Sequence, residues 1–203
     1  MSSVDEAVEA IRAGRPVVLP FDMVYGLAAD PYRDESARRL YRLKGREETQ
    51  PTALVASSVD FLLECIPELR GRAATLVRLL LPGPLTLVVP NPAGRYRWIT
   101  GTRPDTIGVR VPELTGPGGD VLDRVGAVVA TSANRPGESD PKRLDDVPEE
   151  IRNGAGALVD GGELAGTPST VIDLTTSEPR VLREGALPAA DALRRLDAAV
   201  RSS

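Results

Sequence analysis

The sequence has no histidine and a single cysteine, and these shortages remove many familiar catalytic sites. Without an imidazole the chain cannot form a Ser-His-Asp or Cys-His arrangement. One thiol cannot build a zinc site with the usual thiolate and imidazole ligands. That thiol, Cys65, lies in an apolar run typical of a helix, where we expect a small buried residue without a chemical role. Any catalysis must therefore use other side chains.

The sequence also lacks a long hydrophobic run. No stretch approaches the ~20 apolar residues that span a bilayer, and the N-terminus is amphipathic and acidic where a signal peptide would be basic and then apolar. We therefore expect a cytoplasmic protein without membrane contact. The 203 residues are 41% hydrophobic, enough for one sizeable core, and show no break in composition. We expect a single domain over residues 1–203, with no appended C-terminal domain.

Lysine is the third scarce residue. Lys44 and Lys142 are the two lysines among 25 basic residues, so the lysine in Lys44-Gly45-Arg46 points to a specific use. An ammonium is a compact point charge and a guanidinium is a planar fork, so the pair suits the charges of a polyphosphate. Basic residues late in a helix also favour its dipole, and the spacing alone does not decide between the two explanations.

The charge balance bears on possible partners. A net charge of −4 and a pI near 5.1 disfavour a dedicated nucleic-acid-binding protein. Local enrichment could still form a basic patch, made of Arg33, Arg38, Arg39, Arg42, Lys44 and Arg46. Such a patch is compatible with RNA without requiring it.

Apolar segments with the periods of strands and of helices alternate along the chain. Strands are expected at residues 17–19, 24–28, 52–56, 85–89, 107–111, 127–130, 157–159, 170–174 and 181–182. Helices are expected at residues 3–14, 37–43, 59–66, 72–81, 120–124 and 189–201. Gly45 should end the second helix, which puts Lys44 and Arg46 where a helix gives way to a loop. The alternation predicts an α/β domain whose sheet is covered on at least one face.

Small polar or charged residues lie at the ends of several expected strands, namely Arg110, Ser132, Asn134, Ser169 and Arg183. Ligands of open α/β sheets bind beyond strand ends, so these side chains could converge on one crevice. Each also has a local explanation, since Ser132 could cap a turn and Asn134 could adopt a left-handed conformation. Trp98, in an expected loop at residues 91–103, is assigned to covering the core in preference to binding a ligand.

Seven short strings stand out in order along the chain. They are Val24-Tyr25-Gly26-Leu27, Lys44-Gly45-Arg46 with Pro51, Pro82-Gly83-Pro84-Leu85-Thr86-Leu87, Val109-Arg110-Val111-Pro112, Thr131-Ser132-Ala133-Asn134 with Gly137, Ser169-Thr170-Val171-Ile172-Asp173-Leu174, and Leu182-Arg183-Glu184-Gly185. Together they resemble the YrdC-type threonylcarbamoyl-AMP synthase family over about residues 5–195. The family's Lys-x-Arg and Ser-x-Asn pairs are both present, as Lys44/Arg46 and Ser132/Asn134.

This resemblance implies a twisted, largely mixed sheet with flanking helices around a deep, positively lined cavity. It implies a nucleotidyltransferase that converts L-threonine, bicarbonate or carbon dioxide, and ATP into threonylcarbamoyl-AMP and pyrophosphate, with Mg²⁺ accompanying the triphosphate. The product would pass to a transferase that modifies the adenosine next to the anticodon of tRNA. Contact with tRNA or double-stranded RNA is compatible with the resemblance.

The resemblance also assigns roles to residues, position by position. The catalytic residues would be Lys44, Arg46, Ser132 and Asn134. ATP would be bound by Lys44, Arg46, Thr106, Asn134 and Arg183. L-threonine would be bound by Tyr25, Arg110, Ser132 and Ser169. No protein ligand for a metal is assigned.

One departure from the family pattern bears on the substrate. The family usually has Pro-Thr-(Asp or Glu)-Thr-Val-Tyr-Gly, whereas this chain has Pro20-Phe21-Asp22-Met23-Val24-Tyr25-Gly26 and loses two hydroxyls. Phe21 would make the pocket more apolar, so a related adenylate-forming enzyme with another amino-acid substrate is a second hypothesis. A non-catalytic RNA-binding or ribosome-associated module on the same scaffold is the third.

Overall fold

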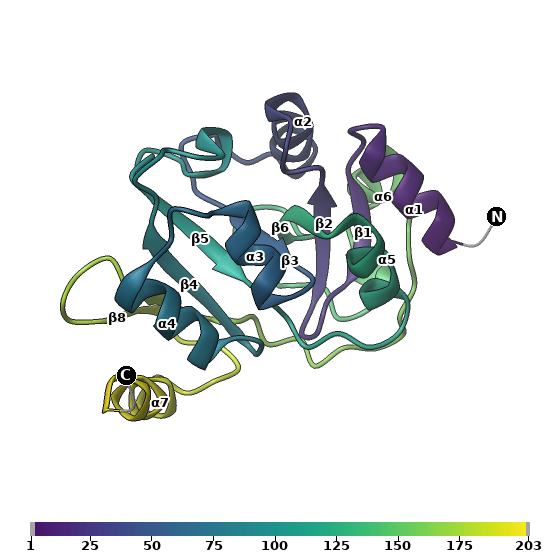
Figure 1. Ribbon diagram of the computed structural model, residues 1–203. Helices are drawn as coiled ribbons and strands as arrows, with labels where there is room; N and C mark the ends of the chain where they lie inside the picture. Colours follow the sequence, from purple (N-terminus) through teal and green to yellow (C-terminus); the bar gives the residue numbers. More distant parts are fainter. Residues whose placement is uncertain (1–2, 202–203) are drawn as a thin grey trace.

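A computed structural model describes residues 3–201, and its strands form one eight-stranded sheet (Figure 1). The strands are β1 (Val17–Pro20), β2 (Tyr25–Ala29), β3 (Ala53–Ala56), β4 (Leu85–Pro90), β5 (Thr106–Arg110), β6 (Ala127–Ser132), β7 (Thr170–Asp173) and β8 (Arg180–Arg183). Their order is β1-β2-β6-β3-β5-β4-β7-β8. The pairs β3–β5 and β4–β7 are parallel and the others antiparallel. The predicted α/β fold with a mixed sheet is therefore confirmed.

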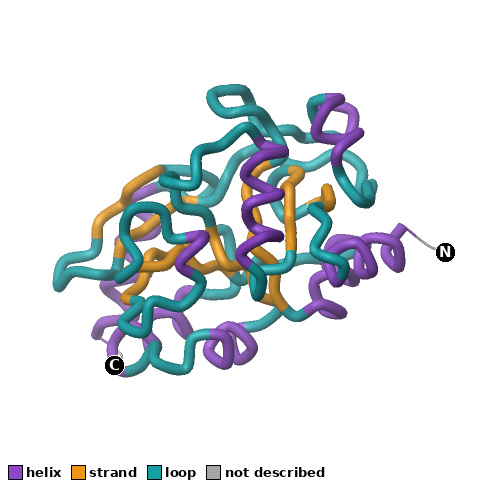
Figure 2. The backbone as a smooth tube through the Cα atoms, turned by 90° about the horizontal axis from the view of Figure 1, so that it is seen from above, coloured by secondary structure: helices purple, strands orange, loops and turns teal. Residues whose placement is uncertain are grey.

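Helices flank this sheet (Figures 1 and 2). They are α1 (Ser3–Arg12), α2 (Asp34–Lys44), α3 (Val59–Cys65), α4 (Gly71–Leu80), α5 (Pro117–Val125), α6 (Glu149–Gly154) and α7 (Ala189–Arg201), with 3-10 turns at Arg97–Ile99 and Leu144–Asp146. Helices α1 and α5 pack together at the β1 side, whereas α7 packs on α4 near the other edge. None of the helices within residues 3–201 is long and apolar enough to cross a membrane.

Alternation of side chains along the central strands separates a core face from an open face. In β4, Leu85, Leu87 and Val89 are fully buried in the core with α3 and α4. Thr86 and Val88 point to the other face and line a cavity, because successive strand side chains alternate between faces. The same pattern in β5 puts Val109 in the core and Arg110 on the cavity side. Over β4 and β5 the sheet thus carries a core on one face and the cavity on the other. A second hydrophobic cluster joins α1, α5 and β1 and includes Phe21 and Val55, which also line the cavity.

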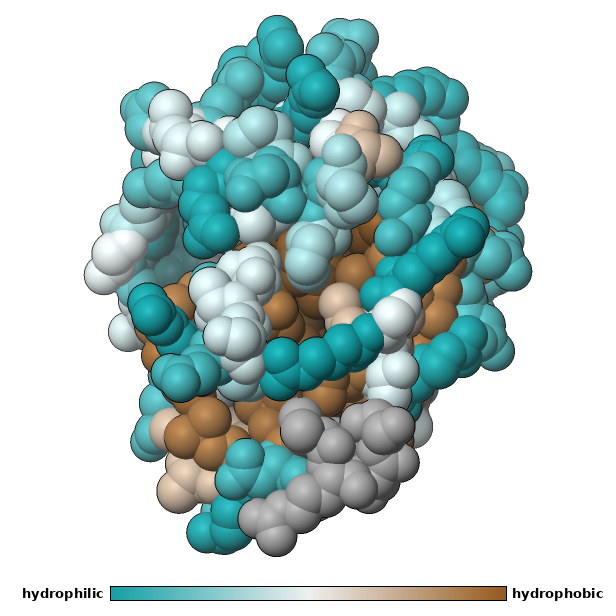
Figure 3. Space-filling model, turned by 60° about the vertical axis from the view of Figure 1, so that its left-hand side comes forward, coloured by the Kyte–Doolittle hydropathy of each residue, from teal (hydrophilic) through white to brown (hydrophobic). Residues whose placement is uncertain are grey.

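The side of the molecule that carries β8 shows apolar groups in a hollow framed by hydrophilic side chains (Figure 3). β8 lies at the edge of the sheet, and its Leu182 is 56% exposed. Leu79 of α4 and Leu193 of α7 are also exposed. Leu182 also lines the cavity, so part of this apolar surface belongs to it.

One predicted strand is absent, and one helix was not predicted. Residues 157–159 form no strand, because they meet β1 through a single bridge, between Val18 and Leu158, before the chain turns away. Helix α6 was not expected, since six residues are too few to display a helical period. Trp98, by contrast, packs against the core, and its indole donates to Pro31 O at 3.0 Å, which confirms the structural assignment.

Candidate functional site

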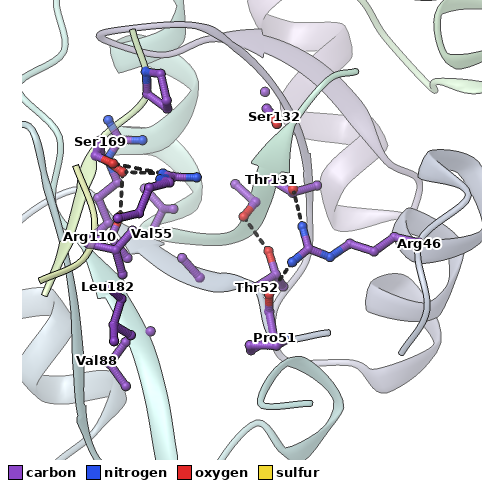
Figure 4. Close-up of a pocket in the computed structure, with 18 of the residues that line it drawn as sticks. Arg46, Pro51, Thr52, Val55, Val88, Arg110, Thr131, Ser132, Ser169 and Leu182 are labelled. Carbon is purple, nitrogen blue, oxygen red and sulfur yellow. Dashed lines mark hydrogen bonds between the residues drawn. The ribbon is translucent and has the colours of Figure 1, made fainter. Parts of the chain in front are cut away.

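A cavity of about 490 Å³ lies over the open face of the sheet (Figure 4). Its walls come from the loop after β1, the loops on either side of β3 and β5, the end of β6, and the β7–β8 edge. Four arginines line it, namely Arg46, Arg103, Arg110 and Arg183. Asp140 is the one acidic residue among the described residues that line it. The cavity is therefore strongly cationic.

Arg46 reaches the cavity because α2 ends abruptly before it. Gly45 adopts the left-handed conformation, with φ 68°, that commonly closes a helix. Arg46 Nη1 then donates to Thr131 Oγ1 at 3.2 Å, and its Nη2 donates to Pro51 O at 2.6 Å (Figure 4). These two contacts hold the guanidinium at the end of β6. The predicted change from helix to loop at Gly45 is confirmed.

Arg110 and Arg183 approach the cavity from the opposite side. Arg183 Nη2 donates to Ser169 O at 2.9 Å, and the Ser169 hydroxyl lies 2.8 Å from that of Thr86. Arg110, whose side chain is 11% exposed, is paired with Asp22. Residues on β5, β7 and β8 thus meet in one wall, although they are distant in sequence.

Two arginines of this cavity, Arg46 and Arg110, are in an environment that disfavours their charge. Burial lowers the pKa of Arg46 and of Arg110, and in both cases the nearby charge of Arg183 lowers it further. The Nε atoms of Arg46 and Arg110 are buried without a hydrogen-bond partner among the described residues. A buried donor without a partner costs about 1–3 kcal/mol. Arg46 and Arg110 line the cavity, where an anionic ligand could pair with their guanidinium groups. Arg152, whose Nε is also buried without a partner among the described residues, lies outside the cavity.

Lys44 is held beside the cavity by the turn after β6. Its Nζ donates to Ser132 O and to Asn134 Oδ1, both at 2.6 Å, and to Asn134 O at 2.8 Å. Ser132 Oγ donates to the same Asn134 Oδ1 at 2.6 Å. Burial, with a contribution from Arg46, lowers the pKa of Lys44 to about 8. The two predicted pairs therefore form one network, in which Ser132 faces the cavity and Lys44 supports it.

The structure brings most of the predicted site residues to this cavity. Its walls include Arg46, Thr106, Arg110, Ser132, Ser169 and Arg183. Lys44 and Asn134 are buried next to it without being part of its surface. Their network reaches the cavity through Ser132.

Tyr25, which the resemblance assigned to threonine binding, does not line the cavity. The side chain is fully buried, and its hydroxyl donates to Asp160 Oδ1 at 2.9 Å and to Gly162 O at 2.8 Å. The hydroxyl also accepts from Gly161 N at 2.9 Å. Tyr25 thereby anchors the crossing segment (residues 160–168), which leads from the β1 side to β7 and the cavity.

Arg103 and Asp140 line the cavity although the sequence did not single them out. Arg103 is 52% exposed, and its Nη1 lies 3.7 Å from Asp173 Oδ2. Its sequence signal was weak, because it is one of several arginines in a loop rich in glycine and proline. Asp140 lies in the loop after β6, which shows no strand or helix period.

The predicted basic patch is partly neutralised. Arg33 lies 3.3 Å from Asp30, Arg38 lies 3.6 Å from Asp34, and Arg39 contacts Glu35 at 2.6 Å. Such surface pairs contribute little to stability, but they lower the net positive charge that a phosphate backbone would meet.

Comparison with known proteins links this cavity to a family. The family model named Sua5, YciO and YrdC, with the description "Telomere recombination", matches residues 9–185. A threonylcarbamoyl-AMP synthase of Pyrococcus abyssi is 36% identical over 181 residues, which cover 88% of this chain and 52% of the relative. One from Pseudomonas fluorescens is 34% identical over 183 residues, covering 85% of this chain and 93% of the relative. The chain thus spans about half the length of the archaeal relative.

Solved structures give the same picture. Pyrococcus abyssi Sua5 in complex with L-threonine superposes with a TM-score of 0.85 at 32% identity, covering 97% of this chain and 58% of that one. Escherichia coli YciO superposes with a TM-score of 0.80 at 24% identity, covering 93% and 91% of the two chains. The second match supports the fold alone.

Proposed function

Because this chain belongs to the Sua5/YciO/YrdC family, we propose that it is an L-threonylcarbamoyladenylate synthase. In this reaction L-threonine, bicarbonate or carbon dioxide, and ATP give threonylcarbamoyl-AMP and pyrophosphate. The observation that carries the proposal is the cationic cavity, which four arginines line: Arg46, Arg103, Arg110 and Arg183. Relatives of this chain are named for the same activity.

We assign the triphosphate to the side of the cavity formed by Arg46, Thr106 and Arg183. Attack on the α-phosphate builds negative charge on phosphoryl oxygens and releases pyrophosphate. Fixed guanidinium and hydroxyl donors stabilise that charge electrostatically, without a histidine. Lys44 and Asn134 contribute by holding Ser132 at the cavity wall.

We assign the amino acid to the wall formed by Arg110 and Ser169. A guanidinium pairs well with a carboxylate, and Arg110 lines the cavity at this wall. Ser169 lies beside Arg183, so this wall adjoins the phosphate side. Holding both substrates in one cavity lowers the entropic barrier to their reaction.

Magnesium would arrive with the triphosphate. The described residues contain no group of three or more acidic, cysteine or histidine side chains that could hold a metal ion. Asp140 is one carboxylate at the cavity wall, and Mg²⁺ commonly takes one or two carboxylates together with phosphate oxygens. The residues present therefore fit a nucleotide-bound ion, whose chemistry is to neutralise phosphate charge.

One observation favours a second candidate, a related adenylate-forming enzyme with another amino-acid substrate. Phe21 lines the cavity, and its ring lies so close to Gly26 that a methyl group there would come within 2.5 Å. This ring makes the wall apolar near the amino-acid side. If the substrate is L-threonine, the adenylate would pass to a transferase that modifies tRNA.

A product assay tests the proposal. The purified protein is incubated with ATP, magnesium, ¹⁴C-bicarbonate and L-threonine, and the products are separated and identified by mass spectrometry. We expect pyrophosphate and a labelled threonylcarbamoyl adenylate, both dependent on L-threonine. Turnover with a different amino acid would support the second candidate, and no turnover with any amino acid would reject both.

A further inference from the structure

The turn between β1 and β2 carries an acidic residue, Asp22, to which the proposed function gives no role. Its carboxylate accepts a hydrogen bond from Arg110 Nη2, and the Arg110 and Asp22 side chains are 11% and 10% exposed. Phe21 and Val24, on either side in sequence, line the cavity. The ion pair therefore lies at the cavity wall, next to the proposed amino-acid position.

The turn itself is fixed. Phe21 N donates to Val24 O at 3.2 Å, and Gly166 N of the crossing segment donates to Met23 O at 2.7 Å. The backbone on either side of Asp22 is thus held within the turn and, from outside it, by the crossing segment. A carboxylate on such a support can hold its partner in one orientation.

Stability alone is a weak explanation for this pair. The desolvation of two buried charges offsets much of their mutual attraction, so a buried ion pair contributes little net stability. Orientation is the better explanation, because Asp22 engages only one of the guanidinium nitrogens. Arg110 Nε remains buried without a partner among the described residues.

The surroundings of Arg110 make Asp22 necessary. The other charged group that acts on Arg110 is Arg183, which repels it and itself donates to Ser169. Among the described residues, Asp22 is the acidic group that pairs with Arg110. Without that anion the guanidinium would face another cation and would lose its orientation.

We propose that Asp22 is a positioning residue for the amino-acid substrate. It fixes Arg110 through Nη2, so that the remaining N–H groups of the guanidinium receive the α-carboxylate of the substrate. This inference rests on the proposed function, because it takes the ligand of Arg110 to be an amino acid. The competing explanation is that Asp22 occupies Arg110 and must be displaced by the substrate.

Steady-state kinetics of the Asp22→Asn variant separates the positioning role from the competing explanation. The variant keeps the size of the side chain and removes its charge. If Asp22 positions Arg110, the KM for L-threonine rises about tenfold, which corresponds to about 1.4 kcal/mol, while the KM for ATP and kcat change little. A misfolded variant would differ, because its kcat would fall as well and the effect would not be confined to the KM for L-threonine. Asp60→Asn, which removes an exposed partner of Arg78, is the matched control and should behave as the wild type.

A double-mutant cycle tests whether Asp22 acts through Arg110. Arg110→Lys alone should raise the KM for L-threonine, and adding Asp22→Asn should raise it little further, because the two residues form one unit. Additive effects would overturn the inference. An unchanged KM for L-threonine in Asp22→Asn would also overturn the inference. A lower KM would overturn it too, and would support the explanation in which the substrate displaces Asp22 from Arg110.

Binding measurements keep this test independent of turnover. If the wild-type protein gives no adenylate, titration calorimetry of the full chain with L-threonine and with other L-amino acids, in the presence of ATP, replaces kinetics. Weaker binding to Asp22→Asn than to the wild type would support the inference even though the proposed activity had failed. Equal binding to both, or binding of no amino acid by the wild type, would overturn it.

Discussion

Lys44 and Asn134, 90 positions apart in the sequence, are joined by a hydrogen bond of 2.6 Å between Nζ and Oδ1. A second bond, of 2.8 Å, runs from Nζ to the main-chain oxygen of Asn134. Lys44 is 3% exposed, so its ammonium group donates to protein oxygens and not to solvent. The lysine thus ties the end of α2 to the turn after β6, which carries Ser132 into the cavity wall.

We expect Lys44→Ala to lower kcat by about 100-fold or more, as loss of a donor that organises a charge-stabilising site does. The substitution also leaves buried oxygens of Ser132 and Asn134 without their donor, which should destabilise the fold by about 1–3 kcal/mol. Pyrophosphate release and urea denaturation measure the two effects. Lys142→Ala, the variant of the other lysine, is the control and should retain wild-type rates. Wild-type turnover in Lys44→Ala would remove the network from the mechanism.

The rate should depend on pH through the same lysine. The folded-state pKa of Lys44 is about 8, below the usual 10.5, because burial disfavours its charge. As the pH rises through this value the folded protein releases the proton before the unfolded chain does, so this group makes the free energy of unfolding rise, not fall. We therefore expect turnover to decline above pH about 8 while circular dichroism shows an intact fold. A flat rate profile up to pH 10 would contradict this role.

Tyr25→Phe should affect stability more than substrate binding. The phenol hydroxyl of Tyr25 makes hydrogen bonds to three residues of the crossing segment, Asp160, Gly161 and Gly162. Its loss leaves the Gly161 N–H without this partner. We expect the free energy of unfolding to fall by about 1–3 kcal/mol, with the KM for L-threonine nearly unchanged. Tyr32→Phe is the control, because that hydroxyl has a weak contact of 3.7 Å with the Cys65 sulfur. A raised KM without a loss of stability would restore Tyr25 as a binding residue.

Phe21 should control which amino acid is accepted. The ring is 5% exposed and forms part of the cavity wall, so its truncation enlarges the space beside Gly26. We expect Phe21→Ala to increase kcat/KM for larger amino acids relative to L-threonine, measured by competition in the product assay. Removal of a buried phenylalanine costs about 3–5 kcal/mol, so Phe21→Leu accompanies it as a better-tolerated variant. An unchanged preference in both would show that the ring has a packing role alone.

Local patterns in the sequence were sufficient to predict most of the fold. Alternating apolar residues marked β4 and β5, and Gly45 marked the end of α2, because these signals depend on neighbours along the chain. The segment 157–159 was mispredicted because strand pairing depends on a distant partner. Its apolar residues resemble a strand, but it meets β1 only through the bridge between Val18 and Leu158.

The candidate site was predictable in its composition but not in its contacts. Strand ends and the family motifs identified Arg46, Arg110 and Arg183, which line the cavity. No pattern along the chain could show that Asp22 pairs with Arg110, or that the Tyr25 hydroxyl faces Asp160, because both contacts depend on how the loops fold across the sheet. These long-range contacts distinguish residues that line the cavity from residues that support it.

A crystal structure of the protein with a non-hydrolysable ATP analogue and L-threonine tests the central claim most directly. The account predicts phosphate oxygens within hydrogen-bonding distance of Arg46 and Arg183, and the threonine carboxylate on Arg110 with Asp22 still paired to it. A nucleotide bound outside this cavity, with no ligand on Arg46, Arg110 or Arg183, would contradict the account.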